Sequence, residues 1–501
     1  MSIANESALA SRSLFQSASQ WLAMLRDGRI GAVELLELHL AQVAKHNPDI
    51  NAVVAQDLDG AFAAARTADS QPRFALPPLH GLPMTIKDTF EVAGMPATCG
   101  FPFLADHRPQ RDADAVARLR AAGAIIYGKT NVPPGAFDWQ SSNPVYGATC
   151  NPWDLTRSPG GSSGGPAASV AAGFSALELG SDIGGSIRCP AHFCGIYGHK
   201  TSFGIVPIRG HIPPLPDQLM RPEMGVAGPM ARSAFDLEVA LDVLTAPEEL
   251  ESRAWSIRIP PSRHERLQDF RVAVWADSSI FAVDTRYVEA IEEYANDLRR
   301  VGAQVNVGAR PDIDWKMSYE TYLATLFQLM AGGTPAPVLQ QYVSAAGQLP
   351  ADDHGYPARL SRALALRHYE YGEIAAKREL LYRQWRHFFN RYDLLICPVM
   401  PTVAYPHDHR GEDAPNAIEV GEARTMLVNG QPRPYFDGLQ WPSVATVANL
   451  PATAVPTGRS VDGLPVGVQL IGPYLEDRTP LRFAQLVEQA LGGFTPPPCV
   501  A

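Results

Sequence analysis

The sequence alternates short apolar runs with helical segments and glycine-rich turns along much of its length. An apolar, strand-like run at 82–88 precedes a helical pattern at 113–122 and a second apolar run at 124–128. Small, helix-compatible residues at 167–173 then lead into another strand-like run at 174–180. Short apolar runs separated by helical patterns are typical of strands in a sheet that helices cover. The alternation therefore predicts an α/β fold.

The rest of the chain shows the same alternation, but fewer of its elements are clearly marked. We expect two N-terminal helices within 19–45, interrupted at Gly28 and Gly31, a break at 46–48 and a strand at 50–54. Further expected elements are strands at 272–275, 303–307 and 394–398, helices at 287–301 and 479–491, and a mainly helical stretch at 312–390. Residues 146–165 carry little apolar periodicity and predict a long structured loop, which in a compact domain is usually functional.

Composition narrows the class of protein. Of 501 residues, 46% are hydrophobic and 19% charged, a globular balance. Because 52 acidic residues outnumber 42 basic ones, the net charge of −10 argues against nucleic acid or anionic lipid as the main partner. The six cysteines form no CxxC pair, so we expect a reduced protein without a metal site. Since no signal-peptide pattern or long apolar run is present, we expect a cytoplasmic protein without a membrane segment.

Two glycine-rich segments carry the clearest chemical signal. They are Pro159–Gly165 (PGGSSGG) and Gly180–Arg188 (GSDIGGSIR). In the second, paired glycines directly before Ser186 allow backbone N–H groups to converge beside a hydroxyl. Acyl transfer requires that combination, a nucleophile with an oxyanion hole. The competing interpretation is that both segments are ordinary turns.

Lys87 ends an apolar, strand-like run, where a lysine must either reach solvent or be held among partners. Taken alone, a solvated ammonium on a buried stem is the commoner arrangement. A desolvated lysine has a lowered pKa, and its neutral amine can serve as a base near neutral pH. The sequence by itself leaves both arrangements open.

Together, Lys87, GGSSGG and SDIGGSIR resemble the amidase signature family of serine hydrolases. Ser162 follows Lys87 by 75 positions and Ser186 follows Ser162 by 24, as in that family. Other blocks resemble the family in the same order: HGLPMTIKD, GKTNVPPGAFD, GATCNPWD, GHKTSFGIVP, GPMARS, DLLICPVMPT and GLPVGVQLIG. The resemblance covers about residues 20 to 490.

The resemblance implies a Ser–Ser–Lys triad. Ser186 would be the nucleophile, and Ser162, after a cis Gly161–Ser162 peptide bond, would relay protons to the base Lys87. The oxyanion hole would consist of the backbone N–H groups of Ile183, Gly184, Gly185 and Ser186. Supporting residues would be Ser163, Asp182 and Arg188.

The resemblance also implies an architecture and a reaction. It predicts a single large domain over 1–501 with a mixed, twisted central sheet. The parts of this domain would be a helical segment at about 1–70, the signature core at about 80–235, a variable helical part at about 245–390 and a return to the core at about 391–495. The implied reaction is hydrolysis of a small-molecule amide, with ester or carbamate hydrolysis as a side activity, and without a cofactor. Because relatives are often dimers, a homodimer is one expectation for an oligomeric state that the sequence leaves open.

The sequence departs from the family at two places. Thr201 stands where proline is frequent, and Pro134-Gly135 stands where many relatives carry an acidic residue. The second departure precedes residues that would line the acyl pocket, and the predicted substrate-binding set is Phe137, Asp138, Trp139 and Gly161. Trp139 and the aromatic residues between 312 and 372 suggest an apolar or aromatic substrate, although packing in the core explains them equally well.

Three alternatives remain. GSSGG also fits the nucleophile elbow of α/β-hydrolases, with Ser163 as nucleophile. The base would then come from a histidine such as His192, His199 or His211. That elbow needs a strand directly before it. Some members of the amidase signature family are A-type subunits of a tRNA-dependent amidotransferase that releases ammonia from glutamine. An inactive scaffold is the third alternative, which the intact triad positions disfavour.

Overall fold

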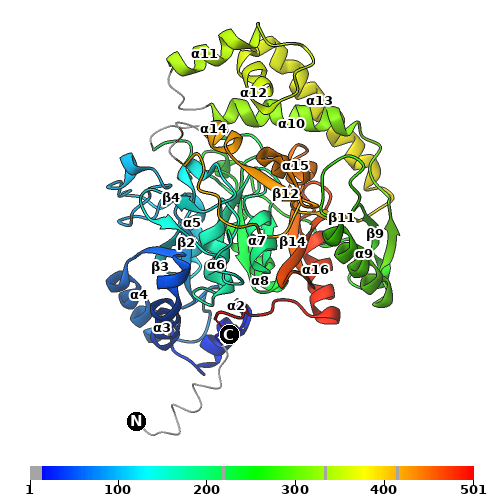
Figure 1. Ribbon diagram of the computed structural model, residues 1–501. Helices are drawn as coiled ribbons and strands as arrows, with labels where there is room; N and C mark the ends of the chain where they lie inside the picture. The colour runs from blue at the N-terminus through cyan, green and yellow to red at the C-terminus, as the bar shows by residue number, and fades with distance from the viewer. Residues whose placement is uncertain (1–13, 217–220, 332–335, 413, 415–416, 501) are drawn as a thin grey trace.

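A computed structural model describes residues 14–216, 221–331, 336–412, 414 and 417–500. Its centre is one 11-stranded sheet in which some neighbouring strands run parallel and others antiparallel (Figure 1). Across the sheet the strands are β1 (Val53–Gln56), β3 (Ile125–Thr130), β2 (Pro83–Lys87), β6 (Leu177–Asp182), β8 (Val226–Ala231), β7 (Tyr197–Lys200), β14 (Ala452–Val461), β15 (Leu464–Ile471), β11 (Leu394–Pro398), β9 (Arg271–Val274) and β10 (Gln304–Val307). The predicted mixed sheet is confirmed.

Helices cover both faces of this sheet. Every residue of β2, β6, β8 and β15 is buried, and successive side chains of a strand point to opposite faces. Helices that contact the strands of this sheet include α6 (Gly164–Ala171), α7 (Arg188–Cys194), α8 (Ala234–Leu244), α9 (Thr285–Arg300) and α16 (Arg478–Leu491). The α/β fold predicted from the sequence is therefore confirmed.

The N-terminal helices α2 (Ala18–Asp27) and α3 (Ala32–Ile50) are separated at the predicted glycines. Gly28 ends α2 in the left-handed conformation with φ 68°, which favours glycine. The predicted break at 46–48 is wrong, because α3 continues through Pro48 to Ile50. The side chain of Asn47 accepts hydrogen bonds from two backbone N–H groups that follow the helix, and these contacts hold the proline-containing last turn in place.

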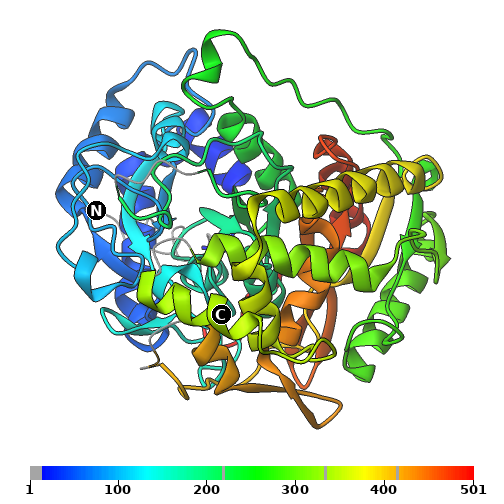
Figure 2. The ribbon, with the colours of Figure 1, turned by 90° about the horizontal axis from the view of Figure 1, so that it is seen from above.

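Four helices form a layer outside the sheet, within the stretch predicted to be helical. They are α10 (Trp315–Met330), α11 (Ala336–Ala346), α12 (Tyr356–Ala365) and α13 (His368–Phe388). Figure 1 shows this layer at one end of the molecule, and Figure 2 shows the same helices crossing over the core. The remaining α-helices are α4 (Leu58–Ser70), α5 (Asp114–Ala121), α14 (Ala417–Glu422) and α15 (Gln440–Thr446). Two hairpins pair β4 (Ser142–Asn143) with β5 (Gly147–Ala148) and β12 (Thr425–Val428) with β13 (Gln431–Pro434).

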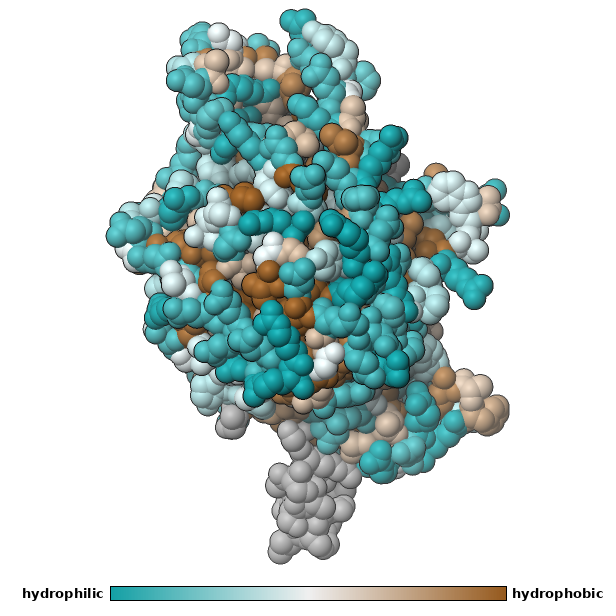
Figure 3. Space-filling view, turned by 90° about the vertical axis from the view of Figure 1, so that its right-hand side faces the viewer, coloured by the Kyte–Doolittle hydropathy of each residue, from teal (hydrophilic) through white to brown (hydrophobic). Residues whose placement is uncertain are grey.

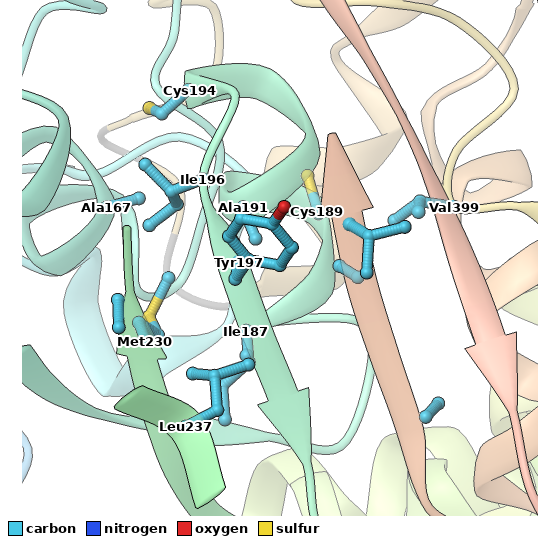
Figure 4. Packing of buried hydrophobic residues seen from close by; sticks show 14 of the residues in the cluster. Ala167, Ile187, Cys189, Ala191, Cys194, Ile196, Tyr197, Met230, Leu237 and Val399 are labelled. Carbon is cyan, nitrogen blue, oxygen red and sulfur yellow. The ribbon is translucent and has the colours of Figure 1, made fainter. Parts of the chain in front are cut away.

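The short helix α7 lies directly on the sheet, which fixes the glycine-rich turn that precedes it. Figure 4 shows Ile187, Cys189 and Ala191 packed beside Tyr197 of β7. A Cβ at Gly198 would lie 2.8 Å from Ile187 Cγ2 and 3.0 Å from Ala191 Cβ, so only glycine permits this approach. The tight packing places the turn before α7 at a defined depth in the core.

The surface differs in character from this interior. Figure 3 turns the side that carries α9 and β9 toward the viewer, and hydrophilic residues predominate there, with smaller hydrophobic areas between them. In α9 the buried residues recur at helical spacing, including Tyr287, Ile291, Tyr294 and Leu298, while its charged residues lie mostly outside. Within the described ranges, no helix combines the length and apolar character needed to cross a membrane.

Candidate active site

Lys87 is the last residue of β2 and is completely buried. Its Nζ lies 2.8 Å from Ser162 Oγ and 2.9 Å from Ser181 Oγ, and in the ammonium form it donates a hydrogen bond to each. Burial lowers the pKa of Lys87 to about 7, because an ammonium ion loses its hydration there. Of the two arrangements left open by the sequence, the desolvated one is present, and the amine can lose its proton near neutral pH.

Ser162 lies in the first glycine-rich segment, and the Gly161–Ser162 peptide bond before it is cis, as predicted. A Cβ at Gly161 would lie 2.5 Å from the Asp138 carbonyl oxygen, so the turn is pressed against the backbone of that segment. The Ser163 N–H donates to the Ser186 carbonyl oxygen at 3.0 Å. This hydrogen bond joins the two glycine-rich segments and brings Ser162 and Ser186 to the wall of the same cavity.

The carboxylate of Asp182 organises the second glycine-rich segment. It accepts hydrogen bonds from the N–H groups of Gly185 and Ile187, both at 3.0 Å, and from the guanidinium of Arg188 at 2.8 and 3.0 Å. Burial alone would raise the pKa of Asp182, but the charge and hydrogen bonds of Arg188 outweigh it and lower the pKa to about 2. The carboxylate therefore stays ionised and holds the turn around Ser186.

Arg188 connects this turn to the C-terminal part of the chain. Its guanidinium also donates to the Pro442 carbonyl oxygen at 3.0 Å, to Gln469 Oε1 at 2.7 Å and to Thr446 Oγ1 at 2.9 Å. Both Arg188 and Asp182 side chains are 0% exposed. An ion pair this deep is tolerated because all three guanidinium nitrogens of Arg188 have hydrogen-bond acceptors.

Two aromatic side chains orient the peptide groups between Asp182 and Ser186. The Tyr322 hydroxyl donates to the Ile183 carbonyl oxygen at 3.1 Å, and Trp139 Nε1 donates to the Gly184 carbonyl oxygen at 2.9 Å. In a trans peptide the C=O and N–H groups point in opposite directions. The Gly184 N–H therefore points away from Tyr322, while the Gly185 N–H is directed to Asp182.

A cavity of about 300 Å³ opens beside these groups. Ser162, Ser181 and Ser186 line it together with Phe137, Asp138 and Trp139 of the predicted substrate-binding set. Most of the remaining wall is apolar: Phe101, Phe103, Ile208, Leu215, Val226, Leu326, Leu329, Met330, Phe436 and Leu439. Gly161, the fourth predicted member of the set, lies behind Asp138 and Trp139 rather than on the wall.

The one acidic side chain of that set is not available as a free charge. Asp138 forms an ion pair with Arg424 and accepts a hydrogen bond from the Tyr435 hydroxyl. Gly135, in the segment where many relatives carry an acidic residue, also lines the cavity and has φ 63°. Thr201, the other departure, is buried and donates to the Ala227 carbonyl oxygen at 3.0 Å.

Comparisons with known proteins identify the family of the chain. The family model described as Amidase matches residues 34–481 of the chain. The chain belongs to the amidase signature family. An amidase-family relative from Chloroflexus aurantiacus, named as the A-type subunit of glutamyl-tRNA(Gln) amidotransferase, is 33% identical over 488 residues, which cover 92% of this chain and 93% of the relative.

Solved structures of the amidase family superpose along nearly the whole chain. The structure of 6-aminohexanoate cyclic dimer hydrolase has a TM-score of 0.75 at 27% identity and covers 98% of this chain and 100% of its own. A structure from a vestigial protein complex related to the origins of an s-triazine catabolic enzyme has a TM-score of 0.77 at 26% identity, covering 95% and 98%. As a member of this family, the chain is an enzyme that acts on carbon–nitrogen amide bonds.

The amidase family assignment leaves the nucleophile-elbow alternative without support. The residues before Ser163 form turns rather than a strand, and Ser163 itself precedes α6 with its Oγ 3.4 Å from the Ser181 carbonyl oxygen. Two of the histidines considered as a base for it lie elsewhere: His192 Nδ1 accepts from the Gly467 N–H, and His199 contacts Asp477.

Two polar residues of this candidate site have no place in the site predicted from the sequence, where one of them, His211, enters only as a base for the nucleophile elbow. Ser181 Oγ lies 2.9 Å from Lys87 Nζ and 2.8 Å from Nε2 of His211, so it connects the lysine to a histidine 30 positions further along the chain. Ser181 stands inside the SDIGGSIR segment, directly before Asp182, and its place in that motif was the available signal. Nothing local in the sequence points to His211, because its contact with the site depends on the fold.

Proposed function

We propose that this chain hydrolyses the amide bond of an apolar small molecule through an acyl-enzyme on Ser186. The observation that carries the proposal is the contact between the buried Lys87 amine, with a pKa of about 7, and Ser162 Oγ at 2.8 Å, on the wall of a cavity that Ser186 shares. A base whose pKa lies near the working pH, in reach of a serine hydroxyl, is what nucleophile activation requires.

In the first half of the reaction Ser186 Oγ attacks the carbonyl carbon of the amide. Its hydroxyl proton passes to Ser162 Oγ as the Ser162 proton passes to the neutral Lys87 amine. The tetrahedral intermediate then collapses: the same relay returns a proton to the leaving nitrogen, the carbon–nitrogen bond breaks and the acyl group stays on Ser186. Water attacks the ester in the second half by the same proton route and releases the acid.

The negative oxygen of the tetrahedral intermediate needs N–H donors aimed at it. We assign this role to the N–H groups of Ile183, Gly184 and Ser186. In the proposed geometry the Gly185 N–H, the fourth predicted donor, acts through Asp182, to which it donates at 3.0 Å. Trp139 and Tyr322 would keep the neighbouring carbonyl oxygens turned away from the developing charge.

The pKa of Lys87 predicts how the rate depends on pH. Below about pH 7 the amine is protonated and cannot accept the Ser162 proton, so kcat/KM should fall about tenfold per pH unit. Above this pKa the rate should reach a plateau. The measurement is kcat/KM from about pH 5 to about pH 9 on an amide for which chemistry limits the rate. A profile without an ascending limb would contradict a lysine base.

The apolar wall predicts the class of substrate. Among the residues that the structure describes, no lysine or arginine lines the cavity, and the two aspartates on its wall, Asp138 and Asp182, are paired with arginines. A zwitterion such as glutamine would lose hydration there without gaining a partner for its carboxylate. Anilides or amides with an apolar acyl group should therefore exceed glutamine in kcat/KM by about 100-fold or more.

Amine and ammonia release across a panel of amides, anilides, esters and carbamates tests this selectivity, with Ser186→Ala run in parallel. Leu329→Ala removes apolar surface from the wall, so it should raise KM for the larger acyl groups more than for acetamide. Preferential hydrolysis of glutamine would refute the apolar assignment.

The second candidate function is that of an amidotransferase A-type subunit, which the name of the Chloroflexus aurantiacus relative favours. Such a chain would release ammonia from glutamine and depend on partner subunits. Activity of the isolated chain on apolar amides would count against this candidate. Glutamine hydrolysis that arises only when partner subunits are added would favour it over the small-molecule amidase.

A further inference from the structure

Backbone hydrogen bonds hold the segment that carries His211 beside the residues that follow Lys87. The Ile212 N–H donates to the Thr89 carbonyl oxygen at 2.7 Å, and the Glu91 N–H donates to the Gly210 carbonyl oxygen at 2.9 Å. The imidazole packs edge-on against Phe90, with ring centroids 4.9 Å apart. These contacts join the 210–212 segment to the residues that directly follow β2.

The hydrogen bonds of the imidazole determine its tautomer. His211 Nδ1 lies 2.9 Å from the Pro213 carbonyl oxygen, which can only accept, so Nδ1 carries the proton. In the neutral ring Nε2 is then an acceptor, and it lies 2.8 Å from Ser181 Oγ. Burial, with a contribution from the charge of Lys87, lowers the pKa of His211 to about 3, so the ring stays neutral at working pH.

The direction of these bonds carries through to the lysine. A serine hydroxyl has one proton, and if Ser181 donates it to His211 Nε2, Ser181 can only accept from Lys87 Nζ. A neutral amine has two N–H groups and one lone pair. With one N–H directed to Ser181, the lone pair remains for the proton of Ser162. If Ser181 donated to Lys87 instead, it would occupy the lone pair that catalysis needs.

We propose that His211 is a positioning residue, which accepts the Ser181 proton and thereby keeps the Lys87 lone pair directed to Ser162. The inference rests on the proposed function, since it assigns the lysine as base. His211 acts through Ser181 and needs no contact with the substrate, although it lines the cavity. The other titratable groups that act on Lys87 are Cys99, Asp182 and Glu178, all buried and on different segments.

The test uses the full-length protein and an aryl sulfonyl fluoride, which reports nucleophile activation without knowledge of the amide substrate. Ser186 Oγ displaces fluoride from sulfur, and the hydroxyl proton leaves through Ser162 to Lys87. We expect His211→Phe, which keeps an aromatic ring beside Phe90 but removes the acceptor, to slow Ser186 labelling by about 10- to 100-fold. On an amide substrate kcat should fall by a similar factor with little change in KM.

Two further variants separate positioning from simple structural damage. His211→Gln places a carbonyl oxygen near the position of Nε2 and should recover most of the rate. In a Ser181→Ala background the competing hydroxyl is absent, so adding His211→Phe should change the labelling rate by no more than about twofold. His192→Gln, which removes a buried imidazole away from the cavity, serves as the control and should label at the wild-type rate.

Each outcome decides the inference. Equal slowing by His211→Phe in the wild-type and Ser181→Ala backgrounds would overturn it, because His211 would then act independently of Ser181. Ring ¹⁵N chemical shifts showing the proton on Nε2 at neutral pH would overturn it as well, with the proposed function intact. If wild-type Ser186 is not labelled and no amide of the panel is hydrolysed, the proposed function fails and the inference fails with it.

Discussion

Replacing Lys87 with methionine is expected to lower kcat/KM by about 10³–10⁴-fold while the protein remains folded. Methionine matches the length and much of the volume of the lysine stem, but it cannot accept the Ser162 proton. The amine contacts Ser162 and Ser181 from a fully buried position, so a water molecule cannot easily act as the base in its place. The measurement is kcat/KM on the best amide of the panel, with circular dichroism to verify folding.

The chain contains a matched control for this variant. Lys200 is also completely buried, its pKa is also lowered to about 7 by burial, and its Nζ donates to the Leu450 carbonyl oxygen at 2.9 Å, away from the cavity. Lys200→Met should therefore retain activity close to that of wild type. Comparable loss in both variants would mean that removing any buried lysine disturbs the enzyme, and near-wild-type turnover by Lys87→Met would remove Lys87 from the mechanism.

Arg188→Ala should reduce the free energy of unfolding by roughly 3–5 kcal/mol. The substitution leaves the ionised Asp182 carboxylate buried without its partner and also removes hydrogen bonds to Pro442, Thr446 and Gln469. Because Asp182 holds the turn before Ser186, activity should fall even under conditions where the variant is folded. Urea-induced unfolding and residual kcat/KM, measured together, test both parts.

An exposed ion pair provides the comparison. Arg383 and Glu379 form an i,i+4 pair on α13, with side chains 76% and 58% exposed, so Arg383→Ala should change the stability by no more than about 0.5 kcal/mol. If Arg188→Ala were no more destabilising than Arg383→Ala, the buried pair would not be the structural connection that its geometry indicates.

Local sequence patterns predicted the helices and strands that neighbouring residues alone determine. The strand ending at Lys87, the helix and strand around 113–128 and the C-terminal helix were all expected within a few residues, because apolar runs and glycine ends determine them. Ser162 and Ser186 stand in glycine-rich segments whose composition already suggests tight turns. These features need no knowledge of the rest of the chain.

Contacts between distant segments could not be predicted from the sequence. The hydrogen bonds of Arg188 reach residues more than 250 positions away, and the hydrogen bond that joins His211 to Ser181 depends on strand pairing with residues 89–91. The continuation of α3 through Pro48 likewise depends on Asn47 contacts that form only once the following strand is in place. Partners of this kind follow from the fold and leave no pattern in a single sequence.

The two sides of the cavity have different importance for folding, which bears on how such a chain acquires new substrates. Ser162 and Ser186 lie at turns packed on the sheet, whereas Leu329 and Met330 belong to α10 in the outer helical layer and are only partly buried. Substitutions outside the packed core usually cost less stability than those within it. Substitutions on the outer side can therefore accumulate while the reacting groups stay fixed. The range of substrates would then change without a change in the reaction.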